Sequence, residues 1–413
     1  MAQDGSIEVT WKGQAFSYLV HHPNSFLKTE NYGSARASGS HAAPGHHTYA
    51  ASGHMDGESD FQAGTGTWNG PAPTGARGMR QKGATEAPEA AAPIVKEPQH
   101  VRLSSGASMP IIGLGTAGIK SPEAVKTALQ IGYRHLDCAQ FYGNEEVVGQ
   151  GIADFVAEGK RQELFVVSKV WNTHHRPSDV RAACEKSLKD LGLTYLDLYL
   201  IHWPEAWTPE TQGLPGSPGY TGPADPATDN TVTIEQTWSA MESLVEAGLV
   251  KSIGVSNFSL VQVEALMASC KIKPAINQIE LHPMLAQRKL VGVLFRKGVH
   301  CVAYSPLGSP GTFKANDLRE QPAVLTVAKE SGKTPAQVIL KWNLQRGIAV
   351  IPKASSEAHL RENLEGCFVW RLSNDHKALL DTMDCNKRFI DFPWKNWGSA
   401  EEGGVTKPST VVL

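Results

Sequence analysis

Beyond about residue 96, short apolar runs alternate with longer segments whose apolar residues recur at helical spacing. The apolar runs are three to five residues long, as is typical of buried strands, whereas spacings of three and four indicate helices with one buried face. The clearest helix is 177–191, because Pro177 suits a first helical turn and Gly192 ends the pattern. Its apolar face consists of Val180, Ala183, Cys184, Leu188 and Leu191.

This alternation continues to residue 351 and predicts a regular succession of strands and helices. Strands are predicted at 111–114, 133–137, 165–169, 198–202, 251–255, 275–279, 300–304 and 349–351. Helices are predicted at 123–131, 146–157, 177–191, 234–247, 260–268, 288–297 and 335–345. A series of β-then-α units over roughly 250 residues indicates a (β/α)8 TIM barrel of the α/β class.

An open, doubly wound sheet is the main alternative fold. Gly113-Leu-Gly115-Thr-Ala-Gly118 matches the Gly-x-Gly-x-x-Gly pattern of dinucleotide-binding turns, but the pattern alone is weak. We therefore interpret the glycines as a tight turn at the mouth of a barrel.

Residues 1–95 are rich in Gly, Ala, Ser and His. Between Lys28 and Pro93 the large apolar residues are too few to bury a core, so we predict a low-complexity, disordered or weakly structured extension before a barrel domain at 96–413. The β-prone runs 7–11 and 16–20 favour a short hairpin near the start. The histidines of this region lack ligand spacing and partner cysteines, so no metal site is predicted.

The composition excludes several classes of protein. A net charge of -2 argues against nucleic-acid or membrane-surface binding, which usually needs a basic field. No apolar run approaches the roughly 18 residues of a membrane span, and no secretory signal is visible. The six cysteines are scattered, which suggests reduced thiols. We therefore predict a cytoplasmic protein that acts on a small molecule, and we expect a monomer.

Ionisable side chains lie at the C-terminal ends of three consecutive predicted strands. Asp137, Lys169 and His202 each end an apolar run, and Tyr142 follows Asp137 after a short loop. Taken singly, each has an ordinary structural explanation, such as a capping carboxylate or a core histidine. Together they indicate an active site, because barrel enzymes carry out their chemistry at this end of the strands.

The motifs around these residues resemble those of the aldo-keto reductases, from about Val101 to about Trp397. The matching segments are Met109-Pro-Ile-Ile-Gly-Leu-Gly-Thr116, Gly132-Tyr-Arg-His-Leu-Asp-Cys-Ala-Gln-Phe-Tyr-Gly-Asn-Glu145, Ser168-Lys-Val-Trp171, Asp197-Leu-Tyr-Leu-Ile-His-Trp-Pro204, Gly254-Val-Ser-Asn-Phe258, Asn277-Gln278, Tyr304-Ser-Pro-Leu-Gly308 and Ile351-Pro-Lys353. Their order and number identify the chain as a member of this family. Among its branches, the chain most resembles the aldehyde reductase and aldose/xylose reductase group.

The four strand-end side chains suit the reduction of an aldehyde or ketone, as the resemblance also implies. Tyr142 is the natural general acid, because its hydroxyl can protonate a carbonyl oxygen that gains charge. An ordinary phenol is too weak an acid at neutral pH. We therefore expect the Lys169 cation to lower the pKa of Tyr142, and Asp137 to keep Lys169 protonated. His202 would donate a hydrogen bond to the carbonyl oxygen.

These side chains cannot supply a hydride, so a nicotinamide cofactor is implied, and the resemblance points to NADPH. By resemblance, Tyr304 stacks on the nicotinamide, and the other contacts to the nicotinamide and pyrophosphate come from Gly115, Thr116, Ser256, Asn257, Gln278, Ser305 and Leu307. Lys353, His359 and Asn363 would hold the adenosine phosphate. Two positions depart from the family, whose usual Ser is Ala354 here and whose usual phosphate-binding Arg is His359.

The resemblance also implies an aromatic substrate pocket formed by Phe141, Trp171 and Trp203, which suits apolar aldehydes. Ala117 stands where many relatives carry Trp, so we expect a wider pocket. The tail at 392–397 either closes over this pocket or only packs against the barrel.

The sequence therefore predicts an NADPH-dependent reductase of aldehydes and ketones. The alternative is a regulatory or scaffolding subunit that keeps the barrel and the cofactor but has little turnover. A third possibility is that residues 1–95, and not the barrel, bind a partner. The four catalytic residues favour the enzyme, and consumption of NADPH with an aldehyde would distinguish it from the subunit.

Overall fold

A computed structural model of the chain describes residues 6–11, 14–19, 99–211, 226–309, 318–392, 394, 395 and 397. Most of the extension predicted to be disordered lies outside the described residues. Within it, β1 (Ser6–Trp11) pairs antiparallel with β2 (Gln14–Leu19), and these are the two strands of the predicted hairpin. The proposed division of the chain near residue 95 stays a prediction.

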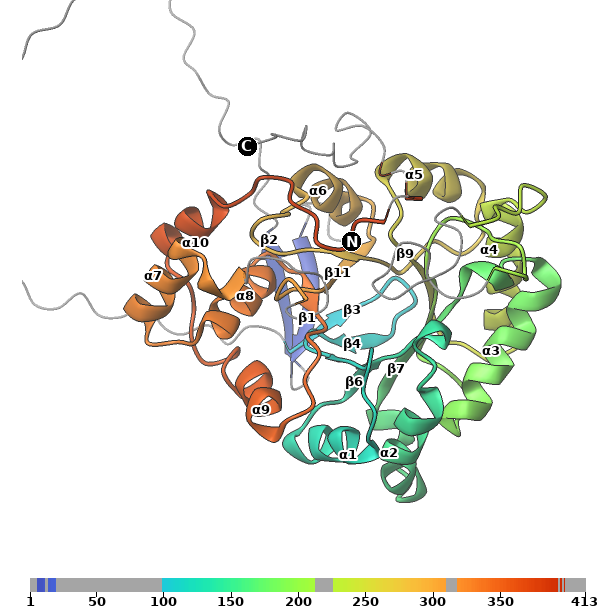
Figure 1. Ribbon diagram of the computed structural model, residues 1–413, viewed down its shortest axis with the longest axis horizontal. Helices are drawn as coiled ribbons and strands as arrows, with labels where there is room; N and C mark the ends of the chain where they lie inside the picture. Colours follow the sequence, from blue (N-terminus) through green and yellow to red (C-terminus); the bar gives the residue numbers. More distant parts are fainter. Residues whose placement is uncertain are drawn as a thin grey trace, which may run out of the picture. The chain divides into compact units, whose positions relative to one another are not determined.

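Among the described residues, eight parallel strands form a sheet that curls into a barrel (Figure 1). In spatial order they are β5 (Leu114–Gly115), β6 (His135–Asp137), β7 (Phe165–Val170), β8 (Leu198–Ile201), β9 (Ile253–Ser256), β10 (Ile276–Glu280), β11 (His300–Tyr304) and β12 (Ala349–Val350). The cylinder closes where Ile112 pairs in parallel with Val350, and the Gly113 N–H donates to the Val350 carbonyl oxygen over 2.9 Å. The predicted TIM barrel is confirmed, and each strand overlaps its predicted range, although β5 shares only Leu114 with the predicted 111–114.

Helices surround the barrel, as Figure 1 shows. Those that the periodicity predicted are α1 (Pro122–Ile131), α2 (Glu145–Ala157), α3 (Pro177–Leu191), α4 (Ile234–Glu246), α5 (Leu260–Ser269), α6 (Arg288–Arg296) and α8 (Pro335–Leu344). The described residues also contain helices that were not predicted, namely α7 (Pro322–Ser331), α9 (Glu357–Glu365) and α10 (Asn374–Asp381). The predicted apolar face of α3 is buried, and Gly192 ends this helix in the left-handed conformation (φ 66°). None of the described helices is long and apolar enough to cross a membrane.

Glycines allow neighbouring strands of the barrel to approach one another closely. A side chain on Gly115 would place its Cβ 2.7 Å from the Ile351 carbonyl oxygen, at the seam between β5 and the end of β12. At Gly254 on β9, a Cβ would lie 2.9 Å from the Ile276 carbonyl oxygen. Both contacts are shorter than any side chain tolerates. The glycine-rich turn therefore serves barrel closure, and the doubly wound alternative is wrong.

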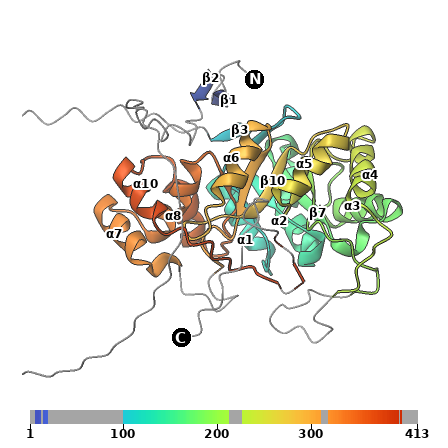
Figure 2. The ribbon, with the colours of Figure 1, turned by 90° about the horizontal axis from the view of Figure 1, so that it is seen from above.

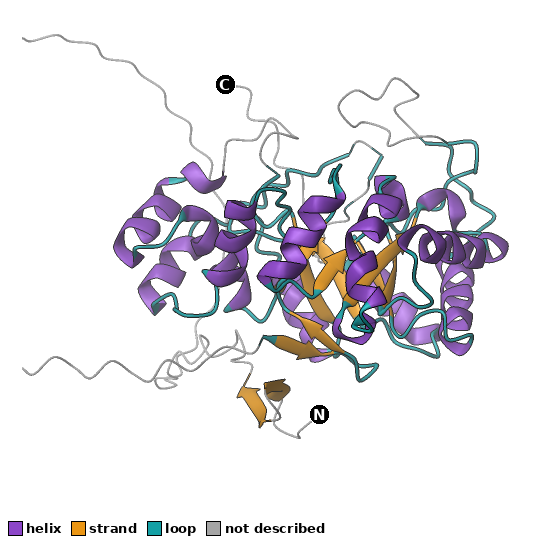
Figure 3. Cartoon of the chain, turned by 90° about the horizontal axis from the view of Figure 1, so that it is seen from below, coloured by secondary structure: helices purple, strands orange, loops and turns teal. Residues whose placement is uncertain are grey.

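A hairpin of β3 (His100–Arg102) and β4 (Ser108–Pro110) lies at the N-terminal end of the barrel strands (Figures 2 and 3). The ring of His300, the first residue of β11, contacts the Arg102 carbonyl oxygen over 3.0 Å. The hydrophobic pattern did not predict this hairpin. It covers the end of the barrel opposite the strand ends that carry the ionisable residues.

Candidate active site

Neighbouring strands bring three of the predicted catalytic residues together at the C-terminal end of the barrel. Asp137 ends β6, Lys169 lies near the end of β7, and His202 follows β8. The Lys169 ammonium donates to Asp137 Oδ1 over 2.5 Å and to the Cys138 carbonyl oxygen over 2.7 Å. The side chains of Lys169 and Asp137 are 0 % and 1 % exposed, so salt in the solvent screens this ion pair little.

Tyr142 reaches the ion pair from the loop that follows β6. A short 3-10 helix, Gln140–Tyr142, carries it, and Gly143 turns the chain towards α2 in the left-handed conformation (φ 61°). The Lys169 ammonium donates to the Tyr142 hydroxyl oxygen over 3.4 Å. The Tyr142 ring lies edge-on to the His202 imidazole, with 5.8 Å between the ring centroids. All four predicted catalytic residues therefore meet at one place.

Burial and charge act in opposite directions on these groups. Burial alone would lower the pKa of Lys169, but the Asp137 carboxylate raises that pKa above its ordinary value, so Lys169 is charged at neutral pH. The predicted lowering of the pKa of Tyr142 is wrong. Burial raises the pKa of Tyr142 more than the Lys169 cation lowers it, so the net direction is upward. The hydroxyl consequently keeps its proton across the neutral range and can donate it.

His202 is neutral at neutral pH. Burial lowers the pKa of its imidazole well below the ordinary value, and the Lys169 cation lowers this pKa further. A neutral imidazole carries a proton on only one of its two ring nitrogens. His202 can therefore donate a hydrogen bond to a carbonyl oxygen only in the tautomer whose proton faces the site.

Residues on β9, β10 and β11 complete the far side of the site. Gln278 Nε2 donates to Asp137 Oδ2 over 2.6 Å, so both carboxylate oxygens of Asp137 have partners. The Asn257 amide donates to the His202 carbonyl oxygen over 3.0 Å and accepts from the Tyr304 hydroxyl over 2.8 Å. These contacts join residues predicted to hold the cofactor to those predicted to do the chemistry.

Other predicted cofactor residues lie on the turns around this group. The Thr116 hydroxyl donates to the Asp137 carbonyl oxygen over 2.9 Å, directly after Gly115. The Ser256 hydroxyl donates to the Gln278 carbonyl oxygen over 2.9 Å. After β11, Ser305 adopts the left-handed conformation (φ 45°), and both Ser305 and Leu307 are partly buried.

The residues predicted to bind the adenosine phosphate lie beyond β12, around the start of α9. Lys353 is exposed, and its backbone nitrogen would lie 3.6 Å from a Cβ on Gly115. Ser356 caps α9, whose first N–H groups favour an anion. Asn363 and Ala354 are buried, and the alanine offers no hydroxyl. An exposed lysine just before a helix N-terminus fits a phosphate group.

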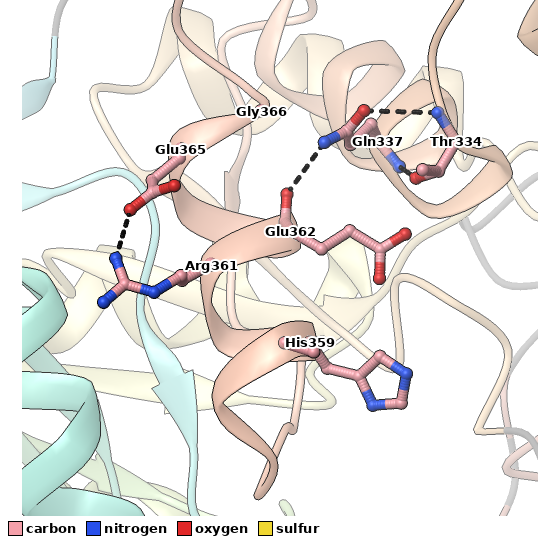
Figure 4. A pocket seen from close by; sticks show the side chains of 8 residues that line it. Thr334, Gln337, His359, Arg361, Glu362, Glu365 and Gly366 are labelled. Carbon is pink, nitrogen blue, oxygen red and sulfur yellow. Dashed lines mark hydrogen bonds and ion pairs between the residues drawn. The ribbon is translucent and has the colours of Figure 1, made fainter.

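His359 lies on the exposed side of α9, beside an open hollow of about 490 Å³ between α8 and α9 (Figure 4). Glu362 projects from the same side of the helix one turn further on. Arg361, which also lines the hollow, is already paired with Glu357 over 2.9 Å and with Glu365 over 2.7 Å. The Glu362 carboxylate would oppose the binding of an anion on this side of α9.

The predicted substrate residues surround His202. Phe141 stacks on Trp171 with 3.9 Å between ring centroids, and Trp171 meets the His202 ring edge-on at 5.1 Å. The Trp203 ring lies nearly parallel to the His202 ring, at 6.5 Å. Trp207 was not predicted from the sequence; it is buried, and its ring centroid lies 5.4 Å from that of Trp171. No strand or helix pattern surrounds Trp207 in the sequence, so nothing there marked it.

The segment after α10 packs on these aromatic side chains. The Trp203 ring contacts those of Phe392, Trp394 and Trp397, with centroid separations of 5.8, 5.1 and 5.8 Å. Trp394 also meets the Trp207 ring edge-on at 4.9 Å. Of the two arrangements that the sequence left open, the tail therefore packs on the pocket residues themselves.

Buried charges fasten this tail to the barrel. Glu280, at the end of β10, is fully buried and accepts from the backbone N–H groups of Phe389 over 2.7 Å and Ile390 over 3.1 Å. The ammonium of Lys395 donates to Glu205, in the loop after β8, over 2.6 Å. The tail is therefore held by hydrogen bonds to the end of β10 and by an ion pair to the loop that contains Trp207.

Comparison with known proteins places the chain in a family. The model of the Aldo/keto reductase family matches residues 112–384. Aldo-keto reductase family 1 member A1-A of Danio rerio is 43 % identical over 300 residues, which cover 70 % of this chain and 91 % of that protein. For member A1 of Homo sapiens, the identity is 40 % and the coverage is 70 % and 90 %. The solved aldose reductase of Schistosoma japonicum is 42 % identical with a TM-score of 0.63, covering 70 % of this chain and 93 % of that one. This chain therefore belongs to the aldo-keto reductase family and is an oxidoreductase that acts on carbonyl groups.

Proposed function

We propose that the protein reduces aldehydes and ketones to alcohols with NADPH as the hydride donor. One observation carries the proposal. Buried hydrogen bonds link Asp137 to Lys169 and Lys169 to the Tyr142 hydroxyl, and the Tyr142 ring contacts the neutral imidazole of His202. A carbonyl oxygen between these last two side chains would meet a proton donor and a hydrogen-bond donor together.

Each of the four side chains has a distinct part in the reaction. Tyr142 donates its proton to the carbonyl oxygen, which becomes a stronger base than a phenolate as it gains negative charge. Lys169 stabilises the phenolate that remains, and Asp137 keeps the ammonium charged and directed at Tyr142. His202 donates a hydrogen bond that stabilises the charge developing on the oxygen.

NADPH would supply the hydride when bound. The residues that would hold it run from the barrel mouth to α9. Tyr304 would stack on the nicotinamide, and the amides of Asn257 and Gln278 would face its carboxamide. Lys353 and the N-terminus of α9 would hold the adenosine phosphate. This donor set suits the cofactor, because neutral amides lie near the uncharged ring and the cation lies near the phosphate.

Turnover distinguishes the enzyme from a regulatory or scaffolding subunit on the same barrel. The test is the loss of NADPH absorbance when the purified full-length protein meets a panel of aromatic and aliphatic aldehydes and ketones. We expect turnover with NADPH and slower turnover with NADH. Tight binding of NADPH without turnover on any member of the panel would favour the subunit.

We expect His359→Arg to tighten the binding of NADPH and to leave that of NADH unchanged. Arginine is always charged and can bind phosphate through two parallel hydrogen bonds, whereas histidine cannot form this paired contact. The gain at pH 8 should be about 1 to 2 kcal/mol, or roughly 5- to 30-fold in Kd. Fluorescence titration of both proteins with each cofactor at pH 8 measures it.

Glu362 supplies the control for this experiment. It projects from the same side of α9 as His359, so it would compete with the phosphate for a new guanidinium. His359→Arg combined with Glu362→Gln should therefore bind NADPH more tightly than His359→Arg alone. An NADPH affinity that is unchanged in both variants would show that position 359 does not face the phosphate.

A further inference from the structure

Buried polar atoms without partners occur on His202 and on the loops that pack around it. Among the described residues, no hydrogen-bond partner is found for His202 Nδ1, His175 Nε2, Trp207 Nε1 or either polar atom of the Asn172 amide. The four side chains are at most 8 % exposed. Leaving such atoms unpaired costs stability, so native proteins contain few of them. Several of them on neighbouring loops indicate buried water that completes their hydrogen bonds.

These side chains come together because the loops after β7 and β8 pack on one another. Asn172 begins the short 3-10 helix after β7, and His175 caps its end. The backbone N–H of Trp207 donates to the Asn172 carbonyl oxygen over 2.9 Å. Trp171, which precedes Asn172, contacts both the His202 ring at 5.1 Å and the Trp207 ring at 5.4 Å. His175 is close enough for a charge on its ring to lower the pKa of His202.

The chemistry of these groups limits the hydrogen bonds that they can make. Trp207 Nε1 can only donate, and the Asn172 amide nitrogen carries two further donor hydrogens. His202 is neutral, and burial lowers the pKa of His175 to about 3, so each ring has one proton and one acceptor nitrogen. The donors of Asn172 and Trp207 therefore need a buried water as their acceptor. A water that accepts from both can only donate, and His202 Nδ1 can receive its hydrogen bond if the ring proton lies on Nε2.

We propose that Asn172 is a positioning residue that keeps His202 in the Nε2–H tautomer, because its amide and Trp207 Nε1 both donate to one buried water, which then donates to His202 Nδ1. The inference rests on the proposed function, in which His202 donates a hydrogen bond to the carbonyl oxygen. With its proton on Nδ1, the ring would instead present a lone pair to that oxygen and repel the charge that develops there. Asn172 thus selects the tautomer that can act, without touching the substrate.

Asn172→Leu tests this proposal, because leucine has a similar volume but cannot form a hydrogen bond. In protein labelled with nitrogen-15 histidine, the chemical shifts of the ring nitrogens show which of them is protonated, and His202→Gln identifies the His202 signals. We expect Nε2–H in the parent and a mixture of tautomers in Asn172→Leu. The kcat should fall about tenfold, less than the roughly 100-fold loss when such a donor is removed outright. The Kd for NADPH should stay unchanged.

Asn343→Leu is the matched control. Asn343 on α8 is also fully buried with an unpaired amide oxygen, but its amide nitrogen donates to the Leu281 carbonyl oxygen over 3.2 Å. This variant should lose stability to a similar degree and leave the His202 tautomer and the kcat unchanged. A loss of kcat as large as that of Asn172→Leu would show that the effect is only structural.

Asn172→Asp provides a second measurement if the leucine variant does not fold. It has the same shape, but its carboxylate can only accept, so the ring proton should move to Nδ1 or a second proton should bind. Nδ1–H in the parent, or a His202 tautomer unchanged in a folded Asn172 variant, would overturn the proposal. A parent that shows the expected tautomer but reduces no carbonyl compound would contradict the proposed function instead, and the role of Asn172 in selecting the tautomer would stand.

Discussion

Replacing Tyr142 by phenylalanine should lower the kcat for aldehyde reduction by at least about 100-fold and leave the Kd for NADPH unchanged. The substitution removes the hydroxyl that receives the Lys169 hydrogen bond over 3.4 Å, and with it the proposed proton donor. The ring and its edge-on contact with His202 at 5.8 Å remain, so the pocket keeps its shape. Steady-state kinetics and a cofactor titration on the same preparation measure the two quantities. A variant that keeps more than about a tenth of the parental rate would exclude Tyr142 as the acid.

The pH profile of the parent protein provides an independent check on this assignment. Tyr142 acts as an acid only while it is protonated, so activity should be lost as the pH rises through its pKa. Burial raises that pKa above the ordinary phenol value of about 10, despite the opposing Lys169 cation. At any pH below about 10, deprotonation of Tyr142 should therefore not reduce the kcat. A fall centred near pH 8 that disappears in Tyr142→Phe would show that the cation outweighs burial.

Lys169→Met should both abolish turnover and destabilise the fold. The Lys169 and Asp137 side chains are 0 % and 1 % exposed, and removal of the cation leaves a buried carboxylate without its ion-pair partner. Breaking such a pair costs about 3 to 5 kcal/mol, a large part of the 5 to 15 kcal/mol that stabilises a typical domain. Turnover should fall at least about 100-fold, because the Tyr142 phenolate loses the charge that stabilises it. Urea unfolding and steady-state kinetics measure the two effects.

A double variant separates the structural effect from the chemical one. Adding Asp137→Asn to Lys169→Met removes the orphaned charge, while Gln278, which now donates to Asp137 Oδ2 over 2.6 Å, can still bond the new amide oxygen. The double variant should recover most of the lost stability and none of the activity. Recovered turnover would mean that the ion pair serves only the fold. A Lys169→Met protein as stable as the parent would contradict the burial seen in the structure.

The local hydrophobic pattern was enough to predict most helices and strands, because the start and end of such an element depend on residues that are close in the sequence. Helix α3 begins at Pro177 and ends at Leu191 as predicted, since its apolar face, its first proline and the following Gly192 are all local signals. Strand β11 spans the predicted 300–304 for the same reason. Helices α9 and α10 were missed because each buries only one or two residues, so their hydrophobic pattern is faint.

In the candidate site too, the sequence predicted the features that depend on short segments and missed the contacts between distant segments. Asp137, Lys169 and His202 could be placed together from the sequence, because parallel strands of a barrel carry their C-terminal ends to one face. Gln278, by contrast, was expected only at the cofactor, and its bond to Asp137 joins residues 141 positions apart. The Glu280 contact with the Phe389 backbone spans 109 positions. No local signal reports contacts of this range.

The sequence by itself therefore determined the barrel, the strand-end residues and their chemical types, since burial periodicity and strand direction are properties of short segments. Only the tertiary structure decided the direction of the pKa shift of Tyr142, the packing of the tail on Trp203 and the burial of polar atoms without partners on His202 and the loops around it. Each of these depends on how deeply a side chain is buried and on what the rest of the chain places around it. Burial and charge compete at Tyr142, and their balance exists only once the strands and loops have come together.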